Sequence, residues 1–524
     1  MQKINDEIYN AARAEQDKGN YEKAFKLYSE GVEQGDVRCN YGVALFYRDG
    51  KFVEKDETKA VEIFASAFSS IKELAEKNEP ISCCIIGFYY FNGFYVSEDK
   101  KVAIEWLKKS ASLGYALAQN NVALRYYNGW NVEEDKAEAF KWFSLAAESG
   151  IPEAQFYMGV YYDFSYGVKE DKFEAVKWYK KAAEQGYATA QYNLGNCYYN
   201  GKGVKEDKTE AVKWYKKAAE QGNVNAQYNL ALCYDDGWGV KEDKLEAVRW
   251  YEKAAEQGYA DAQLELGLYY DKGAGVKEDK AEAVKWYKKA AEQGYADAQF
   301  NLGCCYDFGD GVQEDKAEAV KWYKKAAEQG LPDAQYNLAL CYDNSWGVKE
   351  DKTEAVRWYE KAAEQGLPDA QYNLGCCYDK GEGVQRDIYK AVEWYTKAAE
   401  QGLSEAQYNL GCCYDKGEGV EENKSDVLLF MGDIIKNRRL HKEESDVSYG
   451  AFLQVNKDVD KSYFVNRIKD SFSEADWNTF GEKFKCEYIF FYDKDDHELY
   501  YAQWANFVPN GDINKWEESN TKDN

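Results

Sequence analysis

The chain repeats itself with a period of 36 residues, and this feature constrains its fold more than any other. The segment AQYNLGNCYYNGKGVKEDKTEAVKWYKKAAEQG begins at Ala190, and units in the same phase begin at residues 118, 154, 226, 262, 298, 334, 370 and 406. Ser82 opens one further unit, and Cys39 opens a unit of 43 residues. The seven extra residues are two helical turns, so we expect a longer second helix whose apolar face is not rotated. Such regularity predicts a stacked array of repeats.

Local signals in each unit predict two helices joined by a glycine turn. In the unit that opens at Ala190, Gly201 and Gly203 end the first helix, because glycine adopts backbone angles that are closed to other residues. Asp207 is a good N-cap for the second helix, and Glu210 three residues later predicts a reciprocal capping box. Apolar residues then recur with the 3.6-residue period of an amphipathic helix.

The whole pattern, A-x-x-x-L-G-x-x-Y-x-x-G-x-G-V-x-x-D-x-x-x-A-x-x-W-Y-x-x-A-A-x-x-G, resembles the Sel-1-like repeat, a relative of the tetratricopeptide repeat with a longer turn. The resemblance covers roughly residues 36–435. It implies a right-handed α-solenoid that acts as a scaffold or adaptor in multiprotein complexes. Some secreted relatives join their repeats with disulfides, but the corresponding positions here are mostly Ala, so that subgroup is a poor guide to this chain.

The periodicity divides the chain into four expected parts. Residues 1–35 predict an N-terminal helix pair like that of a tetratricopeptide repeat, and 36–440 predict the solenoid, giving about twelve helix pairs in all. The last unit loses its Trp-Tyr pair, as a terminal capping repeat does. Residues 441–512 abandon the period and predict a small α+β module, with strands in 446–455, 486–493 and 497–504, of which the last two form a hairpin. Residues 513–524 predict a disordered tail. The expected fold is therefore an all-α solenoid followed by this module.

The net charge of −26, with a pI near 4.8, disfavours binding to nucleic acids and to anionic membrane surfaces. No apolar run has the length of a signal peptide or of a membrane span, so we expect a cytoplasmic protein without membrane insertion. The oligomeric state is not predictable from these features.

The 13 cysteines recur mostly in one phase of the repeat, in pairs such as Cys304-Cys305 and Cys376-Cys377. Adjacent residues on a helix point about 100° apart, which is a poor geometry for a disulfide. We expect small buried side chains that stay reduced, with a redox role as the alternative.

Catalytic and metal-binding patterns are sparse. Ser-x-x-Lys occurs at Ser69–Lys72 and in two other unrelated places without its companion motifs. The Gly-x-Gly turns are followed by an acidic N-cap, which would repel a phosphate. A cluster from Asp493 to His497 favours an acidic hairpin turn over a metal site. The sequence therefore predicts no enzyme, no cofactor and no resident metal ion.

The first helices of a solenoid line its inner groove. We number each unit from its opening residue as position 0; positions 2 and 9 then lie on the side away from the second helix. Position 2 is aromatic at Phe156, Tyr192, Tyr228, Phe300, Tyr336, Tyr372 and Tyr408. Position 9 is acidic at Asp163, Asp235, Asp271, Asp307, Asp343, Asp379 and Asp415. These residues, the predicted groove residues, would suit a peptide that carries Lys, Arg or aromatic side chains. Since the first helices carry almost no Lys or Arg, acidic peptide tails are disfavoured.

A structural interpretation of the same residues stays open. The rings could cover the adjacent first helix, and the aspartates could pair with Lys or cap a turn. The Trp at position 24, which runs through nine units from Trp106 to Trp394, favours packing between repeats. Trp130, Trp238 and Trp346 share position 12 in the turn and are either contacts for a partner or lids over the next helix.

The function predicted from the sequence is a non-enzymatic scaffold or adaptor that binds proteins or peptides in an acidic, tyrosine-rich groove. One alternative is a regulatory or host-interaction effector exported without a signal peptide. A second alternative is an enzyme with its active site in the C-terminal module and the repeats as a docking arm.

Overall fold

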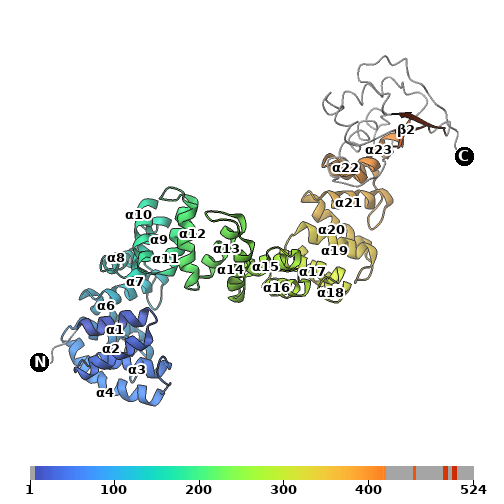
Figure 1. Cartoon of the computed structure of the whole chain (residues 1–524). Helices are drawn as coiled ribbons and strands as arrows, with labels where there is room; N and C mark the ends of the chain where they lie inside the picture. Colours follow the sequence, from blue (N-terminus) through green and yellow to red (C-terminus); the bar gives the residue numbers. More distant parts are fainter. Residues whose placement is uncertain (1–5, 417, 420–451, 456–487, 494–497, 504–524) are drawn as a thin grey trace. The chain divides into compact units, whose positions relative to one another are not determined.

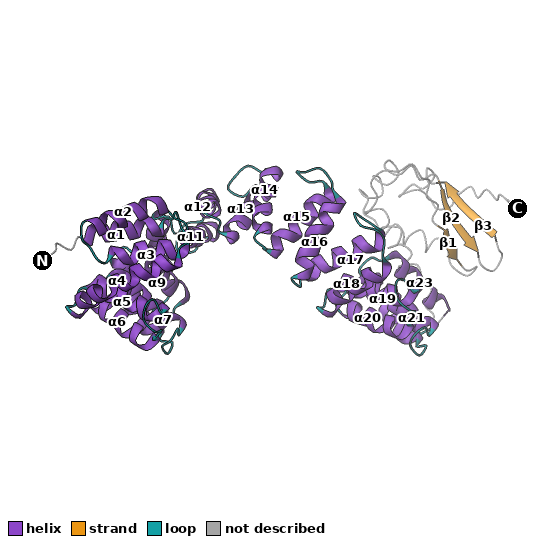
Figure 2. Cartoon of the chain, turned by 90° about the horizontal axis from the view of Figure 1, so that it is seen from below, coloured by secondary structure: helices purple, strands orange, loops and turns teal. Residues whose placement is uncertain are grey.

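The computed structural model describes residues 6–416, 418–419, 452–455, 488–493 and 498–503 (Figure 1). Most of them are helical, in helices joined by short loops and turns (Figure 2). The chain divides into two compact units, one of residues 1–262 and 274–276 and one of residues 263–273 and 277–524. Within the units, consecutive helices pack against each other from α1 to α14 and from α16 to α23, which gives a solenoid of helix pairs. The handedness predicted for this solenoid stays a prediction.

The helices of the first unit have the following bounds: α1 (Asp6–Asp17), α2 (Tyr21–Glu33), α3 (Cys39–Asp49), α4 (Glu57–Glu76), α5 (Pro80–Asn92), α6 (Lys100–Ser112), α7 (Ala116–Asn128), α8 (Lys136–Glu148), α9 (Pro152–Phe164), α10 (Lys172–Glu184), α11 (Ala188–Asn200), α12 (Lys208–Glu220), α13 (Val224–Asp236) and α14 (Lys244–Glu256). Helix α15 (Ala260–Lys272) begins in the first unit and lies mostly in the second.

The second unit continues with α16 (Lys280–Glu292), α17 (Ala296–Phe308), α18 (Lys316–Glu328), α19 (Pro332–Asn344), α20 (Lys352–Glu364), α21 (Pro368–Lys380), α22 (Ile388–Glu400) and α23 (Ser404–Lys416). Three strands follow: β1 (Phe452–Val455), β2 (Tyr488–Asp493) and β3 (Glu498–Gln503). Strand β1 pairs with β2 in parallel, and β2 pairs with β3 antiparallel. Apart from these three strands, the residues of the predicted α+β module fall outside the described ranges. The hairpin turn around Asp495, the second helix of the last repeat and the C-terminal tail also fall outside them, so the module and tail stay predictions.

The helix lengths follow the sequence signals closely. Helix α4 has 20 residues, whereas the second helices of the later repeats have 13, so the insertion in the unit of Cys39 does lengthen the second helix. Asp207 caps α12 by accepting a hydrogen bond from the backbone N–H of Glu210. The reciprocal half of the predicted capping box does not form. The backbone N–H of Asp207 instead donates to the carbonyl of Tyr198, and the Glu210 carboxylate accepts from Lys213.

A glutamine at position 1 bridges neighbouring repeats. The Gln335 side chain donates to the carbonyl of Ala327, near the end of the preceding helix α18, over 3.1 Å. Its amide oxygen accepts from Gln365 at the end of α20, over 2.8 Å. The same carbonyl also accepts from the backbone N–H of Gly330, so the glutamine adds a second, buried hydrogen bond at the end of α18. The glutamines therefore stabilise the stacking of the repeats.

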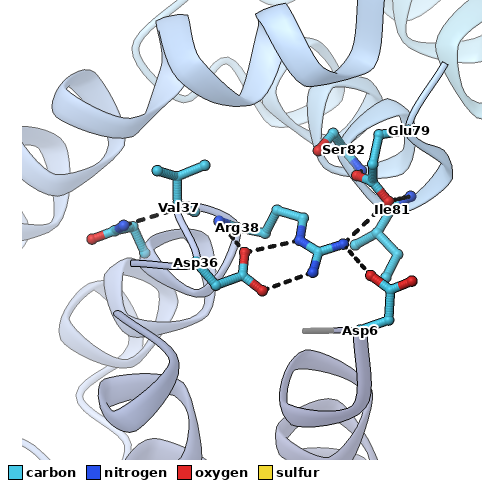
Figure 3. Close-up of polar contacts among 8 residues, drawn as sticks. Asp6, Asp36, Val37, Arg38, Glu79, Ile81 and Ser82 are labelled. Carbon is cyan, nitrogen blue, oxygen red and sulfur yellow. Dashed lines mark hydrogen bonds and ion pairs between the residues drawn. The ribbon is translucent and has the colours of Figure 1, made fainter. Parts of the chain in front are cut away.

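The first repeats are joined by a fully buried arginine (Figure 3). The Arg38 guanidinium pairs with Asp36 over 2.7 Å in the loop before α3. It also pairs with Asp6 at the start of α1 over 2.6 Å and with Glu79, the N-cap of α5, over 3.1 Å. One cation therefore holds together segments from the beginning of α1, α3 and α5.

The cysteines of the described residues are all free thiols, and most are buried. Burial raises the pKa of Cys197, Cys305 and Cys377 to about 12, which makes their reactive thiolate form rare at neutral pH. These properties fit the expectation of small, reduced core side chains. In the part of the chain that the structure describes, no helix combines the length and the apolar character that a membrane crossing requires.

Candidate functional site

The aromatic groove residues at position 2 are partly exposed on successive first helices. Phe156, Tyr192 and Tyr228 have intermediate exposure in the first unit, as have Phe300, Tyr336 and Tyr372 in the second. Tyr408 on α23 is 59% exposed. Each ring is thus in contact with its own repeat on one side and exposed to solvent on the other.

A buried tyrosine at position 25 holds six of these seven rings, all except Tyr408. The centres of the Tyr336 and Tyr359 rings are 6.0 Å apart, and those of Phe300 and Tyr323 are 5.9 Å apart. The same pair recurs at 5.8–6.1 Å in four other repeats, between Phe156 and Tyr179, Tyr192 and Tyr215, Tyr228 and Tyr251, and Tyr372 and Tyr395. Since the partner ring is fixed in the core, the exposed ring has a defined orientation.

The aspartates at position 9 are engaged in ion pairs within their own repeats. Five of the seven pair with the lysine at position 18, the first residue of the second helix. The distances from Nζ to the carboxylate are 3.0 Å for Lys172–Asp163, 2.5 Å for Lys244–Asp235, 2.9 Å for Lys280–Asp271, 2.9 Å for Lys316–Asp307 and 2.8 Å for Lys352–Asp343. The carboxylates therefore do not form a ladder of uncompensated negative charge.

Two of the predicted aspartates differ from the rest. Asp379 has Ile388 at position 18, and it pairs with Arg386 instead, over 3.6 Å. Asp415 lies on α23, and the surroundings of its side chain are outside the described part. In the repeat that opens at Ala190, position 9 is Tyr199, and Lys208 lies 5.3 Å from the centre of its ring.

The aspartates also fix the buried tyrosines that support the exposed rings. The Tyr323 hydroxyl donates to Asp307 over 3.1 Å, and Tyr359 donates to Asp343 over 3.2 Å. Burial, with Asp343 as a further cause, raises the pKa of Tyr359 well above its ordinary value, so the hydroxyl stays a donor. The two predicted sets are thus connected: lysine to aspartate, aspartate to buried tyrosine, and buried tyrosine to exposed ring.

Sequence reasoning missed this connection because it treated positions 2 and 9 separately. The signal was present in the sequence, since Lys at position 18 accompanies Asp at position 9 in five units. The turn brings the end of the first helix next to the start of the second, so residues nine apart meet there. The structural interpretation, in which the aspartates pair with Lys, therefore describes part of their role.

The tryptophans fall into a buried and an exposed group. At position 24, Trp214, Trp250, Trp286, Trp322 and Trp358 are buried, which fits the packing role expected of them. The position-27 lysine covers the ring; for example, Lys325 Nζ is 3.8 Å from the centre of Trp322. The turn residues Trp130, Trp238 and Trp346 are exposed by 56%, 37% and 45%. Their role as contacts for a partner stays a prediction.

In regular repeats the exposed ring and the ion pair are connected through the buried tyrosine. Among the side chains that the structure describes, no three His, Cys, Asp or Glu residues are placed to hold a metal ion. Six of the seven carboxylates at position 9 pair with a cation. The tyrosines at position 25 are buried. At positions 2 and 9, the first helices therefore carry aromatic rings in a fixed orientation next to Lys–Asp ion pairs.

Asp307→Ala should lower the free energy of unfolding by about 1–3 kcal/mol, because it leaves the buried Tyr323 hydroxyl without this acceptor and Lys316 without its counter-ion. Asp310→Ala is the matched control, since Asp310 is an exposed residue of the adjacent turn. Urea denaturation of both variants measures the difference. Equal stability of the two would show that the Asp307 contacts are of no consequence.

Comparison with known proteins identifies the repeat. The family model described as Sel1 repeat matches twelve segments: 14–36, 37–70, 80–115, 116–151, 152–187, 188–223, 224–259, 260–295, 296–331, 332–367, 368–403 and 404–425. No curated protein matches the sequence.

Solved structures of bacterial repeat proteins are similar to the chain. The structure of c5321, a protective antigen present in uropathogenic Escherichia coli strains and displaying an SLR fold, is 36% identical, covers 79% of this chain and 90% of that chain, and has a TM-score of 0.67. A Sel1 repeat protein from Oxalobacter formigenes is 36% identical over 58% of this chain and 88% of that chain, with a TM-score of 0.45. The similarity in fold is supported by the c5321 structure, which has the higher TM-score.

Proposed function

The chain belongs to the Sel1 repeat family, and from this premise we propose that it is a non-enzymatic scaffold or adaptor that binds segments of other proteins on its first helices. Proteins of this family generally mediate protein–protein interactions. The proposed partners carry basic or aromatic side chains, and the proposed contact residues are the rings at position 2 and the aspartates at position 9. The two rival functions, an exported effector and a C-terminal enzyme, gain no support from the relatives or from the described residues.

The repetition of a preorganised aromatic ring carries this proposal. In six repeats the ring at position 2 is partly exposed and packs at 5.8–6.1 Å on a buried tyrosine of the same repeat. A ring that is already oriented loses little side-chain entropy when a partner binds. Successive repeats within one unit would present such rings at regular intervals to an extended or helical segment.

The aspartates would contribute in a different way from the one expected from the sequence alone. A basic side chain of a partner would compete with Lys316 or Lys352 for a carboxylate that is already paired. Exchange of one ion pair for another adds little free energy at a solvent-exposed place. We therefore assign most of the affinity to the rings, and we assign to the aspartates the discrimination against acidic segments.

The test uses fluorescein-labelled synthetic peptides of equal length that are rich in Lys and Tyr, in Lys and Ser, or in Glu and Tyr. Fluorescence anisotropy with the full chain should rank them in that order. The double variant Tyr336→Ala/Tyr372→Ala should weaken binding of the first peptide about tenfold or more, because stacking on two rings is lost. Tyr389→Ala is the matched control, since Tyr389 is 73% exposed at the start of α22 and lies outside position 2.

A second experiment tests the contribution of the position-9 carboxylates to binding. The triple variant Asp307→Asn, Asp343→Asn and Asp379→Asn should reduce the salt dependence of binding and the preference for basic over acidic peptides. Unchanged affinity in the ring variant would contradict the role of position 2. Unchanged charge preference in the aspartate variant would contradict the role of position 9. Far-UV circular dichroism of each variant confirms that the repeats remain folded.

A further inference from the structure

Four successive repeats of the first unit carry an exposed aromatic ring in the turn between their two helices. These turn rings are Phe52, Tyr95, Trp130 and Tyr166, at positions 12 and 13 of their repeats. They lie in the turns that join α3 to α4, α5 to α6, α7 to α8 and α9 to α10 (Figures 1 and 2). Their exposed fractions are 51%, 56%, 56% and 39%, so each ring has a face that a partner can reach.

Three of the turn rings rest on an aromatic ring of the preceding repeat. The ring centres are 5.7 Å apart for Phe52 and Phe25 of α2, 5.5 Å for Tyr95 and Phe68 of α4, and 6.4 Å for Tyr166 and Tyr127 of α7. Tyr166 also stacks on the exposed ring of Phe164, with centres 5.9 Å apart and planes inclined by 21°. These contacts orient the rings before any partner binds.

Two of the turn rings stand on a backbone conformation that favours glycine. Phe52 and Tyr95 have φ angles of +66° and +62° at position 13, where every repeat from Ala154 onward has glycine. A bulky side chain is strained in this left-handed region. Since glycine would form the same turn without strain, the geometry of the turn does not account for the aromatic residues. Strain of this kind is typical of positions that bind a ligand or a partner.

The turn rings recur at the spacing of the repeats. First helices of neighbouring repeats contact each other, as the 4.9 Å between the ring centres of Tyr127 on α7 and Tyr157 on α9 shows. Axes of packed helices are about 8–10 Å apart, so rings in neighbouring turns recur at about that distance. A polyproline II segment rises about 9 Å in three residues, and every third side chain points the same way. In a β-strand, side chains on one face are about 7 or 13 Å apart.

The turns that carry the last three rings are acidic. Residues 93–99, 129–135 and 165–171 contain seven acidic side chains and one basic side chain, and they stay net negative when the lysine that begins each following helix is included. Glu98, Glu134 and Glu170 share position 16, and their side chains are more than half exposed. Each pairs with that lysine over 3.1–3.4 Å. Pairs so exposed contribute little, so a basic side chain of a partner exchanges with them at low cost.

We infer that the turn rings bind a proline-rich segment of a partner protein in the polyproline II conformation, with basic residues between the prolines. Every third residue, a proline, stacks on one ring, and Lys or Arg side chains pair with the glutamates at position 16. Such a segment is ordered before it binds, so it loses little backbone entropy. About ten residues span the four turns. This surface is distinct from the position-2 rings, so the inference goes beyond the proposed function.

Fluorescence anisotropy of the full chain with a fluorescein-labelled peptide of repeated Pro-Pro-Lys tests this surface. Repeated Ser-Ser-Lys keeps the charge without the polyproline II preference, and repeated Pro-Pro-Glu keeps the conformation with the opposite charge. A lysine-rich amphipathic helix repeats its face every two turns, about 11 Å, and represents another conformation with a similar period. We expect Pro-Pro-Lys to bind about tenfold more tightly than each of these peptides at equal length. Equal or tighter binding of any of the three would overturn the proposal.

The double variant Tyr95→Ala/Trp130→Ala removes the rings from two neighbouring turns. It should weaken binding of the Pro-Pro-Lys peptide about tenfold or more. Trp346→Ala is the matched control, since Trp346 is 45% exposed at position 12 but the neighbouring turns carry Asp310 and Glu382 there. It should leave the affinity unchanged. Unchanged affinity in the double variant, or an equal loss in the control, would overturn the assignment of the turn rings.

The variant Tyr336→Ala/Tyr372→Ala separates this surface from the one of the proposed function. It should bind the Pro-Pro-Lys peptide as tightly as the unaltered chain does. Loss of binding in this variant would show that the position-2 rings hold the peptide, and the inference of a second surface would then be wrong.

A charge variant leaves the packing of the rings intact. Glu134→Gln/Glu170→Gln should weaken binding of the Pro-Pro-Lys peptide several-fold and reduce its salt dependence, because two exposed carboxylates are lost. Far-UV circular dichroism measures whether both double variants stay folded, as we expect for side chains at the surface. Unchanged affinity and salt dependence in the glutamine variant would contradict the role of position 16.

Discussion

Arg38→Met should lower the free energy of unfolding of the first repeats by about 3–5 kcal/mol, one of the two largest effects expected for this chain. The substitution removes the cation from a place where three carboxylates converge (Figure 3). Asp36 is the most affected, because its side chain is 3% exposed and would keep its charge in a buried place. Removal of one partner of a buried ion pair costs more than the pair itself contributes, since the remaining charge has lost its compensation.

The effect of Arg38→Met should be confined to the neighbouring repeats. In an array of repeats, each unit contacts only its neighbours, so a local defect unfolds part of the chain before the rest. Native-state hydrogen exchange should show faster exchange in α1 to α5, with little change in α16 to α22. A single transition measured by circular dichroism would average over both regions.

Arg48→Met provides the matched control. Arg48 also lies near the start of the array and forms an ion pair, with Asp49 over 2.6 Å, but its side chain is 36% exposed. Ion pairs of this kind contribute up to about 1 kcal/mol. Equal destabilisation by the two substitutions would show that burial of the Arg38 cluster is not the cause.

The regular part of the fold was predictable because its signals are local. Glycines ended helices and aspartates capped them at positions that the period itself marked, as at Asp207 and Gly201. The length of α4 followed from a count of residues, because two added turns leave the apolar face in register. These properties depend on residues close in sequence, and one unit sufficed to predict them.

The polar contacts of the candidate site were less accessible from the sequence. The Glu210 side chain bonds to Lys213 rather than back to its N-cap, because the carbonyl of Tyr198 already takes the N–H of Asp207. Asp307 pairs with Lys316 across the turn between two helices. A helical wheel describes one helix and does not predict such a contact. The partners of such residues are set by three-dimensional approach, so position on a helix face predicted their location but not their contacts.

The arginines of the first repeats show the limit of reasoning from the average repeat. Few basic residues were expected on first helices, and that is correct for the regular units. Arg13 and Arg125 are exceptions in units that depart from the consensus. Residues that break the repeat pattern cannot be predicted from the average unit.

Gly311→Ala should destabilise the second unit by about 2–5 kcal/mol, through two separate causes. Gly311 has a φ of +70°, where a residue with a Cβ is strained by about 1–2 kcal/mol. A Cβ at this position would also lie 2.1 Å from the carbonyl oxygen of Lys280, which belongs to the backbone of the preceding repeat. Since neither backbone can move without separating the repeats, this overlap adds about 1–3 kcal/mol.

Comparison with Gly330→Ala separates the two causes. Gly330 also has a positive φ, of +98°, but a Cβ there would have no other atom within 4 Å. Chemical denaturation should therefore show a loss of about 1–2 kcal/mol for Gly330→Ala and a further loss for Gly311→Ala. Hydrogen exchange should locate the additional loss at α16, which begins at Lys280, and at α17, which is followed by the turn that contains Gly311. If the two variants are equally stable, backbone conformation alone explains the glycine, and the close approach between repeats contributes nothing to the stability of the array.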